Sequence, residues 1–127
     1  MSKKYKVISG LDVLRILIGV DLDIMSPMHC INLVNIAHLL KTSRYQVKKY
    51  MDMLVNAGVA ELALDFVADE YEFCPYWGYR ITERVRAESI DDIPKGMNRT
   101  YILQVRVMYK KAKVKNDELI DRLFNNR

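Results

Sequence analysis

Polar and basic side chains that can bind nucleic acid cluster within positions 44–49 of the chain. An arginine can donate two hydrogen bonds to a guanine edge, a glutamine can pair with an adenine, and lysines neutralise phosphates. A tyrosine can donate to a phosphate or stack its ring. The same side chains are common on any solvated helix face, so DNA contact and plain solvation both remain open at this point. The cluster comprises Arg44, Tyr45, Gln46, Lys48 and Lys49.

A helix over residues 43–57 is expected to carry this cluster. Val47, Met51 and Leu54 recur at helical spacing, which places them together on an inward stripe. Ser43 stands where a helix N-cap is needed, and Gly58 stands where the chain would turn left-handed after the last turn. With that stripe buried, the N-terminal half of the helix presents its polar cluster outward.

Two further helices are expected before residue 43. Ser9 can cap the first, which should end near residues 19–21 and has Asp12 in its first turn. Asn32 can cap the second, which runs to Lys41 and joins the next helix through a tight connection at residues 41–42. Their inward stripes are expected to be Leu11, Leu14, Leu17 and Ile18 in the first helix and Leu33, Ile36, Ala37 and Leu40 in the second.

A hairpin and a helical region are expected after residue 58. Residues 59–67 and 77–82 predict two strands, joined by an acidic and aromatic loop of about ten residues. Residues 89–94 indicate a break. Residues 100–115 fit both a helical face and strand alternation, and we favour a helix because this stretch lacks Gly and Pro and exceeds the usual strand length. A last helix is expected from Asn116 or Asp117, with the apolar stripe Leu119, Ile120, Leu123 and Phe124.

The stretch over residues 35–59 carries a family resemblance. NIAHLLKTSRYQV (35–47) resembles the run eiAelLgvSrstV of the winged helix-turn-helix superfamily, and KKYMDMLVNAGV (48–59) is similar to its continuation srhLdrLeeaGlv. GYRITE (78–83) resembles the strand that ends the wing, written yrLTekG, although Arg84 and Val85 follow where a glycine is usual. The resemblance covers roughly residues 11–84. MarR-like and related bacterial regulators share these features.

The resemblance implies a fold, a site and a function. The fold is mainly α with a small antiparallel β-hairpin: a winged helix-turn-helix domain over residues 1–93 and a C-terminal helical extension over 94–127 that packs on the domain or dimerises. The helix 43–57 then reads the major groove of double-stranded DNA, and a homodimer binds half-sites about one turn apart, as a transcriptional regulator. A replication or recombination accessory role would use the same contacts. The implied DNA-binding residues are Ser43, Arg44, Tyr45, Gln46, Lys48 and Lys49.

The wing suggests an alternative function. Asp69, Glu70 and Glu72 would be repelled by phosphates, so we expect that the wing tip does not enter a groove. The acidic-aromatic segment 68–79 could instead make the protein an interaction module, an adaptor or inhibitor, because aromatic residues are enriched in interface cores. Trp77 and its neighbours could equally close the small core beneath the hairpin. The candidate protein-interface residues are Tyr71, Phe73, Tyr76 and Trp77.

The C-terminal region offers candidate phosphate contacts. Arg106, Lys110 and Lys113 share one face of the helix expected over residues 100–115. That face could track DNA phosphates or simply be solvated. The apolar stripe on the opposite side is expected to pack on the first helix of the same chain or of a second chain.

Charge is unevenly distributed along the chain. Twenty basic residues against 16 acidic ones give a net charge of +4. Residues 26–58 hold four basic residues against one acid, residues 59–77 hold five acids and no Lys or Arg, and residues 97–127 hold eight basic residues against three acids. This segregation is typical of a surface that meets a polyanion with one part, and it also fits electrostatic docking within the protein.

Composition excludes other classes. A chain of 127 residues, half of them apolar and with only five Gly and three Pro, predicts one folded domain. No uncharged apolar run approaches the roughly 20 residues that span a bilayer, so we expect a complete, cytoplasmic protein without a membrane partner. Cys30 and Cys74, with His29 and His38, lack metal-site spacing and a positioned catalytic base, so we expect no metal, no cofactor and no enzymatic activity.

Overall fold

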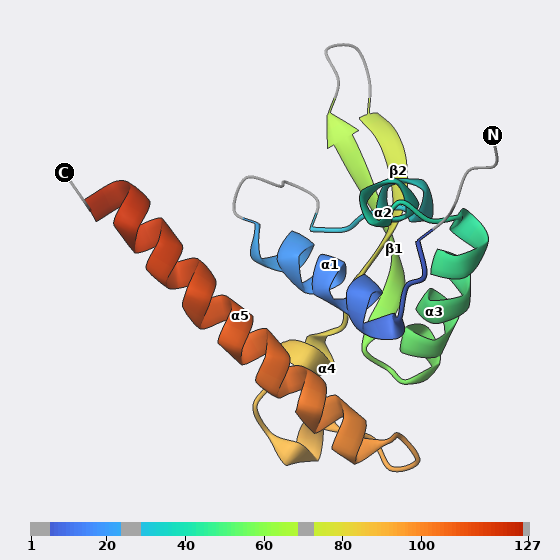
Figure 1. Ribbon diagram of the computed structural model, residues 1–127. Helices are drawn as coiled ribbons and strands as arrows, with labels where there is room; N and C mark the ends of the chain where they lie inside the picture. Colours follow the sequence, from blue (N-terminus) through green and yellow to red (C-terminus); the bar gives the residue numbers. More distant parts are fainter. Residues whose placement is uncertain (1–5, 24–28, 69–72, 126–127) are drawn as a thin grey trace.

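The computed structural model describes residues 6–23, 29–68 and 73–125 (Figure 1). Within these ranges the chain is mainly helical with one small antiparallel sheet, as the sequence predicts. A single 3-10 turn, η1 (Ile90–Asp92), precedes the last helix. The other elements are α1 (Gly10–Leu22), α2 (Leu33–Leu40), α3 (Arg44–Asn56), β1 (Ala60–Ala68), β2 (Phe73–Ile81), α4 (Glu83–Arg86) and α5 (Arg99–Asn125).

All three predicted N-caps begin their helices. Asp12 Oδ2 accepts a hydrogen bond of 2.9 Å from the Ser9 amide, which closes the first turn of α1. Asn32 Oδ1 accepts from the amide of Asn35 at 2.8 Å, and Ser43 Oγ accepts from the amide of Gln46 at 3.2 Å. These contacts satisfy amides that have no partner inside the helix. Only the end of α1 differs, because it lies at Leu22, just beyond the predicted region.

One core joins the helices to the base of the hairpin. The inward stripes of α2 and α3 are buried or half-buried as predicted, whereas in α1 Val13 is buried and Leu11 is 42% exposed. The prediction for Leu11 was therefore wrong: α1 turns Val13 toward the core instead. The largest fully buried side chains are Val13, Leu14, Leu17, Ile36, Val47, Met51, Val59, Ile81, Val85, Ile102 and Val105.

The hairpin is longer than predicted. β1 and β2 pair from Ala60 with Ile81 to Ala68 with Phe73, so four residues connect the strands instead of about ten. A third segment joins the sheet through a bridge in which Ile31 and Tyr79 exchange backbone hydrogen bonds of 2.9 and 2.7 Å. Gly78 permits this close approach, since a Cβ there would lie 3.0 Å from the Ile31 nitrogen.

The end of the hairpin leads directly into α4. Thr82 N-caps this short helix, and its Oγ1 donates a 2.7 Å hydrogen bond to the Gly58 carbonyl. Gly58 itself has φ of +82°, the left-handed conformation predicted for the end of α3. Val85 is fully buried, so the departure from the usual glycine supplies a core side chain.

The C-terminal region forms one continuous helix, α5. The preference for a helix over a strand across residues 100–115 is confirmed, but the predicted separate helix from Asn116 or Asp117 is wrong. Asn116 does not cap a new helix; its Nδ2 donates to the carbonyl of Leu22 at 3.2 Å and ties α5 to the end of α1. α5 packs on α1 and α4, with α1 between it and α3 (Figure 1). None of the helices described combines the length and apolar character needed to cross a membrane.

Candidate nucleic-acid interface

A rigid turn between α2 and α3 fixes the start of α3. Lys41 ends α2 in the left-handed conformation, with φ of 55°, and the Thr42 amide donates to the Ala37 carbonyl at 3.0 Å. Ser43 then caps α3. Because a left-handed residue and two specific hydrogen bonds define this turn, the direction of α3 relative to α2 is set by the backbone.

The buried side of α3 determines which side chains face outward. Val47 and Met51 are fully buried and Leu54 nearly so. Outside this stripe, the first two turns of α3 expose four of the six predicted DNA-binding residues. These are Arg44, Tyr45, Lys48 and Lys49, with Tyr45 77% exposed.

Ser43 and Gln46 occupy less open positions. Ser43 is half-buried and its hydroxyl serves as the helix cap. Gln46 is also half-buried, and it lines a small recess that includes Ile8 and Tyr50. Base contact through Gln46 would therefore require its side chain to turn outward.

Local electrostatics differ among the exposed cations. Lys48 Nζ forms a 2.5 Å ion pair with Asp52 Oδ1, one turn along the helix, with both side chains about half exposed. The hydrogen bond to Asp52, and after it the electrostatic interaction with Tyr79, raises the pKa of Lys48 above the ordinary lysine value. Lys49 Nζ lies 5.5 Å from the centre of the Tyr50 ring. Within the described part of the chain, the guanidinium of Arg44 makes no hydrogen bond or ion pair.

The wing candidates are only partly described. Tyr71 lies outside the described residues, and Phe73 and Tyr76 belong to β2, with side chains outside the description. Trp77 is 58% exposed, and Leu62 on β1 is 55% exposed. The interpretation that Trp77 closes the core beneath the hairpin is therefore wrong.

Arg106 is not a surface residue, in contrast to its predicted place among the phosphate contacts. It is 9% exposed, and its Nε and Nη1 donate to the carbonyls of Arg84 and Ser89 at 2.7 and 2.9 Å. Arg84 lies in α4 and Ser89 follows it. These backbone carbonyls need hydrogen-bond donors, and a helix of four residues has too few amides to supply them. Lys113 is exposed as predicted, and Lys110 lies 3.9 Å from Glu88. Both belong to α5, which lies on the other side of α1 from α3 (Figure 1).

A polar cluster that the sequence did not predict joins α1, α4 and α5. Asp21 accepts from Arg86 Nη1 at 2.6 Å and from the Tyr109 hydroxyl at 2.9 Å. Arg86 also donates to Glu83 at 2.9 Å. Burial, together with the hydrogen bond to Asp21, raises the pKa of Tyr109 to about 12. The three residues are far apart in sequence, so no local pattern indicates their contact.

This cluster predicts an alkaline loss of stability. Because the pKa of Tyr109 rises from 10.0 to about 12 on folding, its neutral hydroxyl stabilises the fold fully below pH 10, and this contribution disappears as pH rises toward 12. Tyr109→Phe should therefore unfold with a weaker dependence on pH across that interval, and at neutral pH it should lose about 1 kcal/mol with the hydrogen bond. Denaturant unfolding at several pH values measures both. Tyr45→Phe, at an exposed ring, is the matched control, and an identical pH dependence in wild type and Tyr109→Phe would refute the assignment.

Comparisons with protein-family models, curated proteins and solved structures found no match. Chemistry at the site therefore rests on its own geometry. Among the described residues, no group of three or more His, Cys, Asp or Glu side chains is placed to hold a metal ion. What the arrangement offers is a capped, well-packed helix that exposes two lysines, an arginine and a tyrosine on one side.

Proposed function

We propose that the protein binds double-stranded DNA as a winged helix-turn-helix transcriptional regulator, with the N-terminal half of α3 in the major groove. The observation that carries this proposal is the set of exposed side chains Arg44, Tyr45, Lys48 and Lys49 on the first two turns of α3, outside its buried stripe. An α-helix with such a face fits the width of the major groove. The turn at residues 41–42 holds it as the second helix of a helix-turn-helix.

Each exposed side chain has a distinct role in this proposal. Arg44 reads a guanine edge through two hydrogen bonds, since its guanidinium is not engaged within the described residues. Lys48 and Lys49 neutralise phosphates, and Tyr45 donates to a phosphate or stacks. The first turn of α3 adds unpaired amides and the positive end of the helix dipole, which also attract phosphate.

The sheet supports the winged assignment. The Ile31–Tyr79 bridge lays β2 beside the segment that enters α2, so the hairpin is tied to the helix-turn-helix through backbone hydrogen bonds. A hairpin that follows the helix-turn-helix is the arrangement that the resemblance over residues 11–84 implies, and the bridge at Ile31 adds a third segment to it. The hairpin projects from the helices in Figure 1.

Two single variants should distinguish base reading by Arg44 from phosphate contact by Lys48. If Arg44 reads a guanine, Arg44→Ala should lose about 1–3 kcal/mol of discrimination between the selected site and a site with that base pair changed. Lys48→Ala should weaken binding to both sites alike and flatten the salt dependence by about one unit. Binding to a selected and a mutated duplex at several salt concentrations measures this. Unchanged binding in both variants would remove α3 from the interface.

An interaction module is the second candidate, favoured by the exposure of Trp77 and Leu62 on the hairpin. Paired strands place Leu62 opposite Tyr79 and Leu64 opposite Trp77, so the exposed pair lies on neighbouring strands. Aromatic side chains of this kind anchor protein interfaces. In that case Trp77→Ala should abolish capture of a partner, while charge reversal at Lys48 and Lys49 should leave it intact; the opposite pattern favours DNA.

A further inference from the structure

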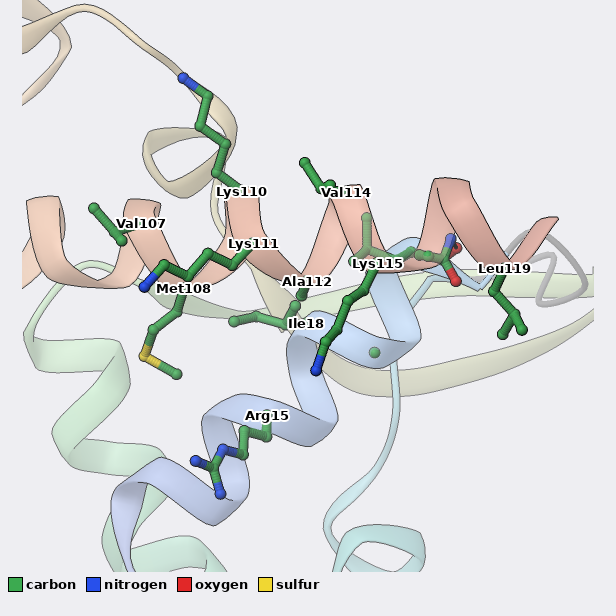
Figure 2. Close-up of a pocket in the computed structure, with 13 residues that line it drawn as sticks. Arg15, Ile18, Val107, Met108, Lys110, Lys111, Ala112, Val114, Lys115 and Leu119 are labelled. Atoms are coloured by element: carbon green, nitrogen blue, oxygen red, sulfur yellow. Dashed lines mark hydrogen bonds between the residues drawn. The ribbon is translucent and has the colours of Figure 1, made fainter. Parts of the chain in front are cut away.

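An open groove lies between α1 and α5. It has a volume of about 1080 Å³, and its floor is formed mostly by apolar side chains, including Ile18, Leu22, Met108 and Ala112. Lys115 extends from α5 toward α1, and Arg15 on α1 also lines the groove (Figure 2). Lys111 also lines the groove. The groove thus combines an apolar floor with positive charge.

The last part of α5 has the complementary character. Asn116 of α5 is hydrogen-bonded to Leu22, the last residue of α1. Beyond Asn116, α5 continues to residue 125 and projects away from the domain (Figure 1). Leu119, Leu123 and Phe124 on this part are 54, 70 and 67% exposed. Exposure of three large apolar side chains to water within six residues is unfavourable, because it costs roughly 25 cal/mol of free energy per Å² of apolar surface.

Charge is also complementary between the two halves of this helix. Residues 107–115 hold four lysines and no acid, whereas residues 116–125 hold Asp117, Glu118 and Asp121 against Arg122. A single helix cannot fold back on itself, so its own tail cannot fill its own groove. In an antiparallel pair of identical helices, each acidic tail lies beside the basic segment of the other, and both contacts form at once under two-fold symmetry.

We infer that a second copy of this chain docks here, in an antiparallel α5–α5 pair. In this dimer Leu123 and Phe124 of each chain enter the other chain's groove, and Asp117 and Glu118 lie near the other chain's Lys111 and Lys115. The α3 helices stay uncovered, since α1 separates them from α5 (Figure 1). This interface does not rest on the DNA-binding proposal, and its test does not use DNA.

Mass measurement in solution tests the dimer. Sedimentation equilibrium of the wild-type chain should give twice the 14.9 kDa chain mass. Leu123→Glu should raise the dissociation constant at least about tenfold, because it places a charge in the apolar contact. Leu39→Glu, at an equally exposed leucine on α2, should leave the mass unchanged. A wild-type monomer across the concentration range, or equal effects of the two variants, would overturn the proposal.

Charge exchange tests the antiparallel arrangement itself. Lys111→Glu with Lys115→Glu places glutamates at the positions that face the acidic tail and leaves residues 107–115 without net charge, and Asp117→Lys with Glu118→Lys makes both halves positive, so each double variant alone should be monomeric. An equimolar mixture should restore a heterodimer, because each groove then meets a tail of opposite charge. Circular dichroism and thermal unfolding verify that both variants fold. Dimers of either variant alone, or a mixture that stays monomeric while both are folded, would contradict the pairing.

Discussion

Reversing the charges of Lys48 and Lys49 together should lower the affinity for duplex DNA on the order of a hundredfold. Two phosphate contacts are lost, and two carboxylates take their place beside the phosphates. The fold should survive, because both side chains are exposed and the core stripe of α3 is untouched. The new glutamate at position 48 would face Asp52, which costs a few tenths of a kcal/mol in helix stability.

A matched control separates position from net charge. Lys95→Glu with Arg99→Glu changes the net charge by the same amount at exposed sites just before and at the start of α5. Its affinity for DNA should fall far less, because it acts only through the long-range field. Equal loss in the two double variants would mean that α3 has no special role in binding.

Replacing Arg106 with Met should destabilise the fold by about 3 kcal/mol. Two charge-assisted hydrogen bonds to backbone carbonyls are removed, each contributing about 1.5–3 kcal/mol, and two partly buried acceptors lose their donors. Methionine fills much of the same volume, so lost packing is a smaller contribution. Urea unfolding of the variant measures this change.

Two further variants make the Arg106 result specific. Arg106→Lys keeps the charge but cannot reach both carbonyls as the planar guanidinium does, so it should recover only part of the loss. Arg99→Met, at an exposed arginine on the same helix, should change stability by less than about 0.5 kcal/mol. If Arg106→Met were as stable as wild type, the two hydrogen bonds would not hold α4 to α5.

Local signals in the sequence predicted the helical frame well. Asn32 and Ser43 begin their helices because their side chains accept from free amides three residues on, and at Ser9 the Asp12 carboxylate accepts from the free amide; neither contact needs long-range information. Gly58 ends α3 for a similarly local reason, its positive φ. The exposed face of α3 was predicted from the helical spacing of Val47, Met51 and Leu54.

Features that depend on distant contacts were missed. The returning strand was predicted over residues 77–82, but β2 begins at Phe73 and includes Pro75; in a two-stranded hairpin each strand has a free edge, where a residue without an amide hydrogen is tolerated. Arg106 was assigned to the surface because it shares a helical face with Lys110 and Lys113, although its spacing of four from the buried Ile102 places it on the packed side. Packing of α5 on the first helix was expected from its apolar stripe, but the groove between the two helices and the Asp21 cluster were not, because they depend on side chains far apart in the sequence.

The most direct test of the DNA-binding proposal is a salt titration of wild-type protein with a fluorescent mixed-sequence duplex of about two helical turns, followed by anisotropy. We expect binding at low salt that weakens steeply as salt rises, with a log–log slope about two units steeper than that of the variant reversed at Lys48 and Lys49. Absence of binding even at low salt, or equal slopes for the two proteins, would contradict the proposal that α3 binds DNA.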